Sequence, residues 1–275
     1  MSFIKANIYA DMVREKFEGR IKVLQLAQDL GNLEGLGNGD TISFPKWALI
    51  GDAKEMEKGV ALVPEELQST EQTVKIKQVG KAVRVYDSEN LTSIGNQMDE
   101  GATQTAIVMA RKIDADLIAD MVKAPFQAPT VAGDAITSAE IEKAMLNFGD
   151  DRDVEDFSGI VINSLLIPSF YEMKEFTDAT NTTTVAGNGI LSNGMLGFYR
   201  GIPVYVSDKG TYDDNAQTCI TFIIKKGAIG YKMAKDIDIE LEREAKLKAT
   251  DIVTDALYAT ALVKDDGVVV LKLNA

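Results

Sequence analysis

The stretch from Asn96 to Lys123 has a hydrophobic pattern that predicts one long helix. Apolar side chains recur every three or four residues and therefore share one face: Met98, Ala102, Ala106, Met109, Ile113, Leu117 and Met121. The opposite side is predicted to carry Glu100, Thr103, Arg111 and Asp114. Asn96 is suited to cap the helix and Pro125 to stop it. At about 1.5 Å per residue the helix spans roughly 42 Å, so we expect a sheet along its apolar face and solvent or a neighbouring subunit on the other.

The region before this helix has a different pattern, with two strand-like ends around a polar middle. Thr41–Trp47 and Thr73–Val85, the latter interrupted by Gly80, favour strands, and Leu49–Ser69 has too few apolar residues for a core. The pattern predicts a two-stranded arm of on the order of 30 Å with an irregular tip. Such a ribbon is marginally stable alone, so we expect it to lie on a neighbouring subunit. The alternative is that both strands fold back into the parent core.

The remaining N-terminal half gives weaker signals. Met1–Leu30 is mostly compatible with helix, and Gly31–Gly39 is a glycine-rich connection without the spacing of a phosphate loop. Thr137–Phe148 begins with the capping box Thr137–Glu140 and predicts a second helix. The acid-rich run Asp150–Asp156 lacks the spacing of a calcium loop, which favours a solvated loop over a metal site.

From Ser158 onward strands and helices are mixed. Strands are predicted at Gly159–Ile162, Ile202–Val206, Cys219–Ile224 and Ile237–Glu242. Asn163 or Ser164 is expected to cap a helix that runs through Phe176, with Pro168 distorting its first turn. Thr177–Gly189 is a polar loop expected to be mobile or to make contacts. Leu257–Val263 and Val268–Leu273 flank Lys-Asp-Asp-Gly and predict a terminal hairpin. The fold class is therefore α+β.

Composition narrows the functional classes. The chain has 275 residues, a net charge of −13 and no histidine. Its acidity disfavours general binding to nucleic acid or anionic membranes, although a local basic patch remains compatible with it. The lack of histidine excludes Ser-His-Asp, Cys-His and His-ligated zinc chemistry. Cys219 is expected in the core of a protein from a reducing compartment, and neither a signal peptide nor a membrane span is evident. No catalytic, cofactor or metal site is predicted.

Several local sequences, taken in order, resemble one protein family. Residues 39–46 read GDTISFPK at the start of the arm, and 50–53 (IGDA) and 57–59 (EKG) lie within it. Residues 110–117 (ARKIDADL) lie in the long helix, and 159–163 (GIVIN) and 201–207 (GIPVYVS) lie in later strands. This succession resembles the major capsid proteins of tailed bacteriophages, which have the Hong Kong 97-type fold, and it covers nearly the whole chain.

The resemblance implies a structural, non-enzymatic protein that forms hexamers and pentamers of an icosahedral head around double-stranded DNA. It implies an N-terminal arm at 1–39, an extended β-arm at 40–86, a peripheral domain at 87–137 and 237–275, and an axial domain at 138–236. Because no long N-terminal scaffold segment precedes the arm, a separate scaffolding protein is expected, together with a portal. Assembly is expected in the host bacterial cytoplasm, without membrane contact.

Assembly contacts are expected mainly on the arm and the long helix: Trp47, Lys54, Glu57, Lys58, Lys75, Lys77, Arg84 and Arg111. Trp47 suits either a core position or an interface anchor. Lysines on the arm are expected for solubility rather than for covalent crosslinking between subunits. Two other functions stay open, namely a bacterial nanocompartment shell of the same fold and an α/β enzyme without histidine chemistry.

Overall fold

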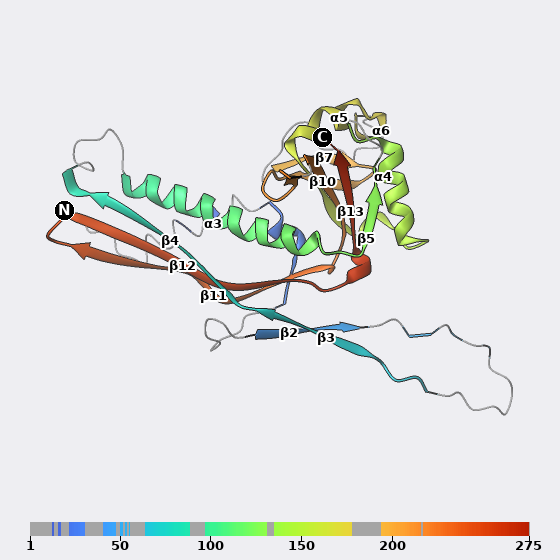
Figure 1. Cartoon of the computed structure of the whole chain (residues 1–275), viewed down its shortest axis with the longest axis horizontal. Coiled ribbons are helices and arrows are strands. Elements are labelled where there is room, and N and C mark those ends of the chain that lie inside the picture. The colour runs from blue at the N-terminus through green and yellow to red at the C-terminus, as the bar shows by residue number, and fades with distance from the viewer. Residues whose placement is uncertain are drawn as a thin grey trace.

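The computed structural model describes residues 13, 16, 17, 22–30, 41–47, 50, 51, 53, 55, 64–88, 97–130, 135–177, 194–215 and 217–274. In this part of the chain a long helix lies along a long twisted sheet, and a second sheet with short helices stands at one end (Figure 1). A thin ribbon extends away on the other side of the long sheet (Figure 1). The predicted Gly31–Gly39 connection, most of the Thr177–Gly189 loop and the Asn96 cap lie outside the described residues.

The long sheet has four strands in the order β1-β11-β12-β4. Its bounds are β1 Gln28–Asp29, β11 Ile229–Glu244, β12 Ala249–Leu262 and β4 Lys77–Tyr86. β11 and β12 form an antiparallel pair from Ile229↔Leu262 to Glu244↔Ala249, and β4 adds antiparallel to β12. The helix α3 (Gln97–Met121) packs on this sheet, so that Met109 and Ile113 share a core with Ile252.

The structure confirms the long helix and most of its predicted buried face. Met109 is 1% exposed and Leu117 0%, while Glu100 and Arg111 are exposed. The prediction for Asp114 is wrong, because this residue is 4% exposed and faces the N-terminal segment. The helix is therefore covered on more than its apolar face, and a polar side chain forms part of that covering contact.

The second sheet has the order β5-β13-β10-β6-β8-β7, and β9 pairs with β10 beside it. The strand bounds are β5 Phe126–Pro129, β13 Val268–Asn274, β10 Thr218–Lys225, β6 Phe157–Ile162, β8 Ile202–Val206, β7 Met195–Tyr199 and β9 Tyr212–Asp213. The helices α4 (Ser138–Met145), α5 (Ile167–Glu172) and α6 (Lys174–Thr177) lie around this sheet (Figure 1). Phe170, Phe176 and Tyr199 fill the core beneath them.

Several local predictions in this half are confirmed. Glu140 accepts a hydrogen bond from the Thr137 N–H at 2.8 Å, which completes the capping box of α4. Cys219 is 2% exposed, as a core residue should be. Asn163 caps a 3-10 turn, Ser164–Leu166, instead of a full helix, and Pro168 follows in the first turn of α5. A second break at Met173 separates α5 from α6.

Three predictions about strands and helices are wrong, and some strands were not predicted. The terminal hairpin does not form, because β12 pairs with β11 and β4 whereas β13 pairs with β10 and β5. The strand break falls at Ile76, not Gly80, since β3 (Ser69–Lys75) ends where that buried side chain turns into the long sheet. Residues 22–30 form a 3-10 turn and β1 instead of a helix. β5 and β7 were not predicted.

Candidate assembly surfaces

The ribbon consists of β2 (Thr41–Trp47) and β3, and it is fixed to the body at its base. The two strands pair antiparallel over seven positions, from Thr41↔Lys75 to Trp47↔Ser69. Ile42 and Ile76 are buried against Leu257, Ala259 and Ala261. Toward the tip each residue from 64 to 71 is exposed. Because a lone two-stranded ribbon is marginally stable in water, its exposed length suits contact with a second surface.

One polar contact joins the ribbon to the body, and a second lies within the arm near its tip. The Lys46 ammonium lies 2.6 Å from the Asp265 carboxylate, which belongs to the 3-10 turn Asp265–Gly267 between the two sheets. Nearer the tip, Glu65 accepts a hydrogen bond from the Gly51 N–H at 3.1 Å. Exposed pairs of this kind contribute at most about 1 kcal/mol, so they direct the ribbon more than they stabilise it.

Half of the predicted contact residues can be placed fully. Lys54, Glu57 and Lys58 lie outside the described residues, and for Trp47 the structure describes the backbone, which pairs with Ser69. The side chains of Lys75, Lys77, Arg84 and Arg111 are all exposed. They do not form one cluster: Lys75 is on the ribbon, Lys77 and Arg84 are at opposite ends of β4, and Arg111 is on α3.

Two of these candidates already have partners within the chain. The Lys77 ammonium lies 3.6 Å from Asp116 on α3. Arg84 donates two hydrogen bonds of 2.6 Å to Asp251, which raises the pKa of Arg84 and lowers that of Asp251. Arg243 likewise makes a bidentate contact with Asp87, donating hydrogen bonds of 2.8 and 2.5 Å to its two carboxylate oxygens. These pairs hold the far end of the long sheet together, because planar guanidinium matches carboxylate geometry.

Three acids on α3 make contacts that the hydrophobic pattern did not predict: Asp114, Asp116 and Asp120. Their position among apolar residues of the helix was the signal in the sequence that could have pointed to them. Asp114 accepts backbone N–H bonds from residues 22, 23 and 24 at 3.0–3.2 Å. Asp116 accepts from the Tyr258 hydroxyl at 2.7 Å, and Asp120 from the Thr260 hydroxyl at 2.6 Å. The three acids therefore tie the helix to the N-terminal segment and to β12.

Burial acts to raise the pKa of both Asp114 and Asp116, but the net shifts of the two acids are opposite. Burial raises the pKa of Asp114, since the three backbone N–H bonds offset the desolvation incompletely. Burial also acts to raise the pKa of Asp116, but hydrogen bonds from Lys112 and Tyr258 outweigh it and the pKa is lowered. Burial and the Asp116 carboxylate together raise the pKa of Tyr258. The Asp116 carboxylate is therefore held ionised as a fixed structural charge.

No metal-binding group of three or more acidic or cysteine side chains is present among the described residues. In the same part of the chain, no helix combines the length and apolar character needed to cross a membrane. The exposed features that remain are the ribbon and the charged faces of α3 and the long sheet. Exposed surfaces of this kind suit contact with other molecules.

Comparison with known proteins gives a consistent result, although no family model matches the chain. The major capsid protein of Staphylococcus phage phiMR11 is 25% identical over 259 residues, covering 93% of this chain and 88% of that protein. The head structure of Helicobacter pylori bacteriophage KHP40 aligns with a TM-score of 0.66 at 12% identity, covering 93% and 91% of the two chains. The structure of Gordonia phage Cozz aligns at 0.65 with 16% identity, covering 92% and 86%.

The capsid structure of cyanophage P-SCSP1u has a TM-score of 0.61 at 15% identity and covers 89% of this chain and 86% of its own. Each of these structural matches covers most of both chains. The chain has the Hong Kong 97-type fold of phage capsid proteins, and the sequence similarity supports a major capsid protein of a tailed phage.

Proposed function

We propose that the protein is the repeating subunit of a closed icosahedral head, arranged in hexamers and pentamers around double-stranded DNA. The observation that carries the proposal is the ribbon, which is exposed from residue 64 to residue 71 and projects from the body (Figure 1). In the assembly its tip lies on the neighbouring subunit and buries there the surface that it exposes in the monomer. Obligate interfaces bury thousands of Å², and an extended ribbon supplies such area with few residues.

Within this proposal each part of the chain has a separate role. Residues 1–39 form an N-terminal arm, 40–86 the extended arm, 87–137 with 237–275 the peripheral domain, and 138–236 the axial domain. The pairing of β13 with β10 favours moving residues 268–274 into the axial domain, and the pairing of β4 with β12 favours moving residues 77–86 into the peripheral domain. Loops of the axial domain meet at the centre of each hexamer or pentamer.

The partners in the proposal come from the resemblance and from composition. A separate scaffolding protein directs assembly in the host cytoplasm, and a portal occupies one vertex. The net charge of −13 keeps the general attraction to DNA weak, so the enclosed genome moves freely during packaging and ejection. The role is structural, without catalysis, cofactor or membrane contact.

Replacing Leu49–Ser69 by a short Gly-Ser turn tests the arm. We expect a soluble, folded subunit that no longer assembles, because the clamp on the neighbour is lost. Negative-stain electron microscopy and size-exclusion chromatography, with and without the neighbouring phage genes, measure the outcome, and circular dichroism checks the fold. Shells of normal size from this variant contradict the proposed clamp.

A further inference from the structure

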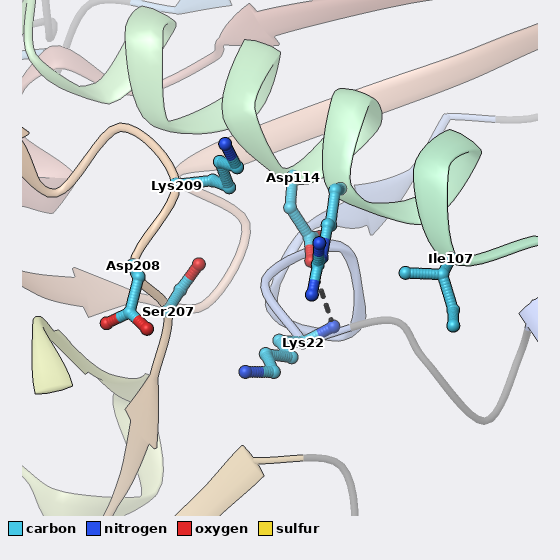
Figure 2. A pocket seen from close by; sticks show the side chains of 7 residues that line it. Lys22, Ile107, Asp114, Ser207, Asp208 and Lys209 are labelled. Atoms are coloured by element: carbon cyan, nitrogen blue, oxygen red, sulfur yellow. Dashed lines mark hydrogen bonds between the residues drawn. The ribbon is translucent and has the colours of Figure 1, made fainter. Parts of the chain in front are cut away.

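A pocket of about 350 Å³ lies where α3, the segment around Lys22 and the turn after β8 meet (Figure 2). Its lining is basic on a chain that is acidic overall. Three cationic side chains from three separate segments contribute to it: Lys22, Arg111 and Lys209. None of the three has an ion-pair partner within 4.0 Å in the part of the chain that the structure describes.

The two acids of the lining are engaged elsewhere. Asp114 turns its carboxylate toward the backbone N–H groups of residues 22–24, and Figure 2 shows one of these bonds. Asp208 accepts a hydrogen bond from the Ser164 N–H at 2.9 Å and points away from the pocket (Figure 2). Asp114 still attracts the Lys22 ammonium, so the uncompensated positive charge of the lining lies mainly on Arg111 and Lys209.

Ser207 supplies a neutral donor in the same wall. The residue is 4% exposed, and its hydroxyl points into the pocket (Figure 2). This hydroxyl has no hydrogen-bond partner among the described residues. Because this hydroxyl is unpaired and lines the pocket, it is free to donate to a polar ligand there.

The backbone around the pocket holds these groups in place. Gly210 follows Lys209 with a φ of 81°, and a Cβ there would lie 2.9 Å from the Cγ2 atom of Ile118. The glycine thus allows the turn to approach α3 closely. On the other side the three N–H bonds to Asp114 fix the backbone that carries Lys22. The pocket is a built feature of three packed segments.

We propose that this pocket binds a phosphate group. A guanidinium, two ammonium groups and a hydroxyl offer donors from several directions, and the oxygens of a tetrahedral phosphate accept from several directions. A carboxylate presents its two oxygens in one plane and would leave part of this set unpaired. The phosphate group comes either from free phosphate or from a nucleic-acid backbone. In a shell around DNA, a nucleic-acid backbone would make a local contact here with a subunit whose net negative charge otherwise repels DNA.

Titrations of the full-length, unassembled protein test the site. The probes are inorganic phosphate, followed by ³¹P NMR, and a fluorescent duplex oligonucleotide at about 50 mM salt, followed by anisotropy. The test variants are the double reversal Arg111→Glu with Lys209→Glu, and Ser207→Ala. Lys81→Glu is the matched control, because Lys81 is exposed on β4, away from the pocket.

We expect the double reversal to weaken phosphate binding at least about tenfold, Ser207→Ala to weaken it about threefold, and Lys81→Glu to leave it within about twofold. If the oligonucleotide shows the same ranking and inorganic phosphate displaces it, the source is the nucleic-acid backbone. If phosphate alone shows the ranking, the source is free phosphate.

Equal affinities for wild type and double reversal would overturn the proposal, as would tighter binding of a poly-glutamate peptide than of phosphate at this site. If the double reversal alters the melting curve, Lys209→Gln is used for the same comparison, with a loss of about threefold expected. Neither result bears on the ribbon, because removal of the arm tip tests assembly and leaves the pocket intact.

Discussion

The long helix and the ribbon are both extended elements, yet they are held in different ways. α3 is covered along most of its length, with twelve buried residues and a row of acids that bond to other segments. Among the described residues, the ribbon is buried at its base, at Ile42 and at the adjoining Ile76, and is exposed from residue 64 to residue 71. The helix therefore gives the subunit its stability, whereas the ribbon provides contact area at little cost to the fold.

The largest expected effect comes from placing a charge in the covered helix. Met109→Asp puts an unpaired carboxylate at a side chain that is 1% exposed, and we expect a loss of more than about 4 kcal/mol in the free energy of unfolding. Val108→Asp is the matched variant, because Val108 is the next residue and is 44% exposed. Urea denaturation measures both, and equal midpoints would show that the covered face has been assigned incorrectly.

Local signals predict the helix and many strands, but not their partners. The Met109 face follows from spacing within one segment, and so does the capping box at Thr137. The sequence of the turn between β12 and β13 does not show whether the two strands pair with each other. In the structure β12 pairs with β11 and β4 in one sheet, and β13 pairs with β10 and β5 in the other. Tertiary pairing of this kind has no signature inside the segment itself.

The same reason explains the errors around the candidate surfaces. Asp114 has the composition of an exposed helix position, and its burial follows from three backbone N–H groups that arrive from residues 22–24. The basic pocket joins Lys22, Arg111 and Lys209 across nearly 190 residues of chain. The exposed arm was predictable, because it depends on a local lack of apolar residues between two strands.

A smaller effect is expected from the contact between Asp116 and Tyr258. Tyr258→Phe removes a hydroxyl that donates to the carboxylate at 2.7 Å, and we expect a loss of about 1–2 kcal/mol near neutral pH. The lowered pKa of Asp116 means that its ionised form stabilises the fold above the unfolded pKa of about 4, and that this stabilisation is lost as pH falls through the lower folded pKa.

Urea denaturation of both proteins between about pH 3 and pH 7 tests this dependence on the charge of Asp116. The difference between wild type and Tyr258→Phe should be constant in the upper part of the range and shrink at its acidic end. Thr260→Val is a useful comparison, because it removes the neighbouring hydroxyl that donates to Asp120. A difference that does not change with pH would show that the hydroxyl acts through packing instead of through the charge of Asp116.

The smallest effect is expected at the base of the ribbon. Lys46→Ala removes the 2.6 Å contact with Asp265, and since this carboxylate is 53% exposed, we expect the free energy of unfolding to change by less than about 0.5 kcal/mol. Ile42→Ala, four residues earlier on β2, should cost about 2 kcal/mol, because Ile42 is 6% exposed. Hydrogen exchange of the β2 and β3 amides separates the two variants further. Lys46→Ala should accelerate exchange in the ribbon and leave α3 unchanged, since the ribbon opens without unfolding the helix. If Lys46→Ala instead destabilises the whole subunit as much as Ile42→Ala does, the ribbon belongs to the stable core and the contrast between the two elements is wrong.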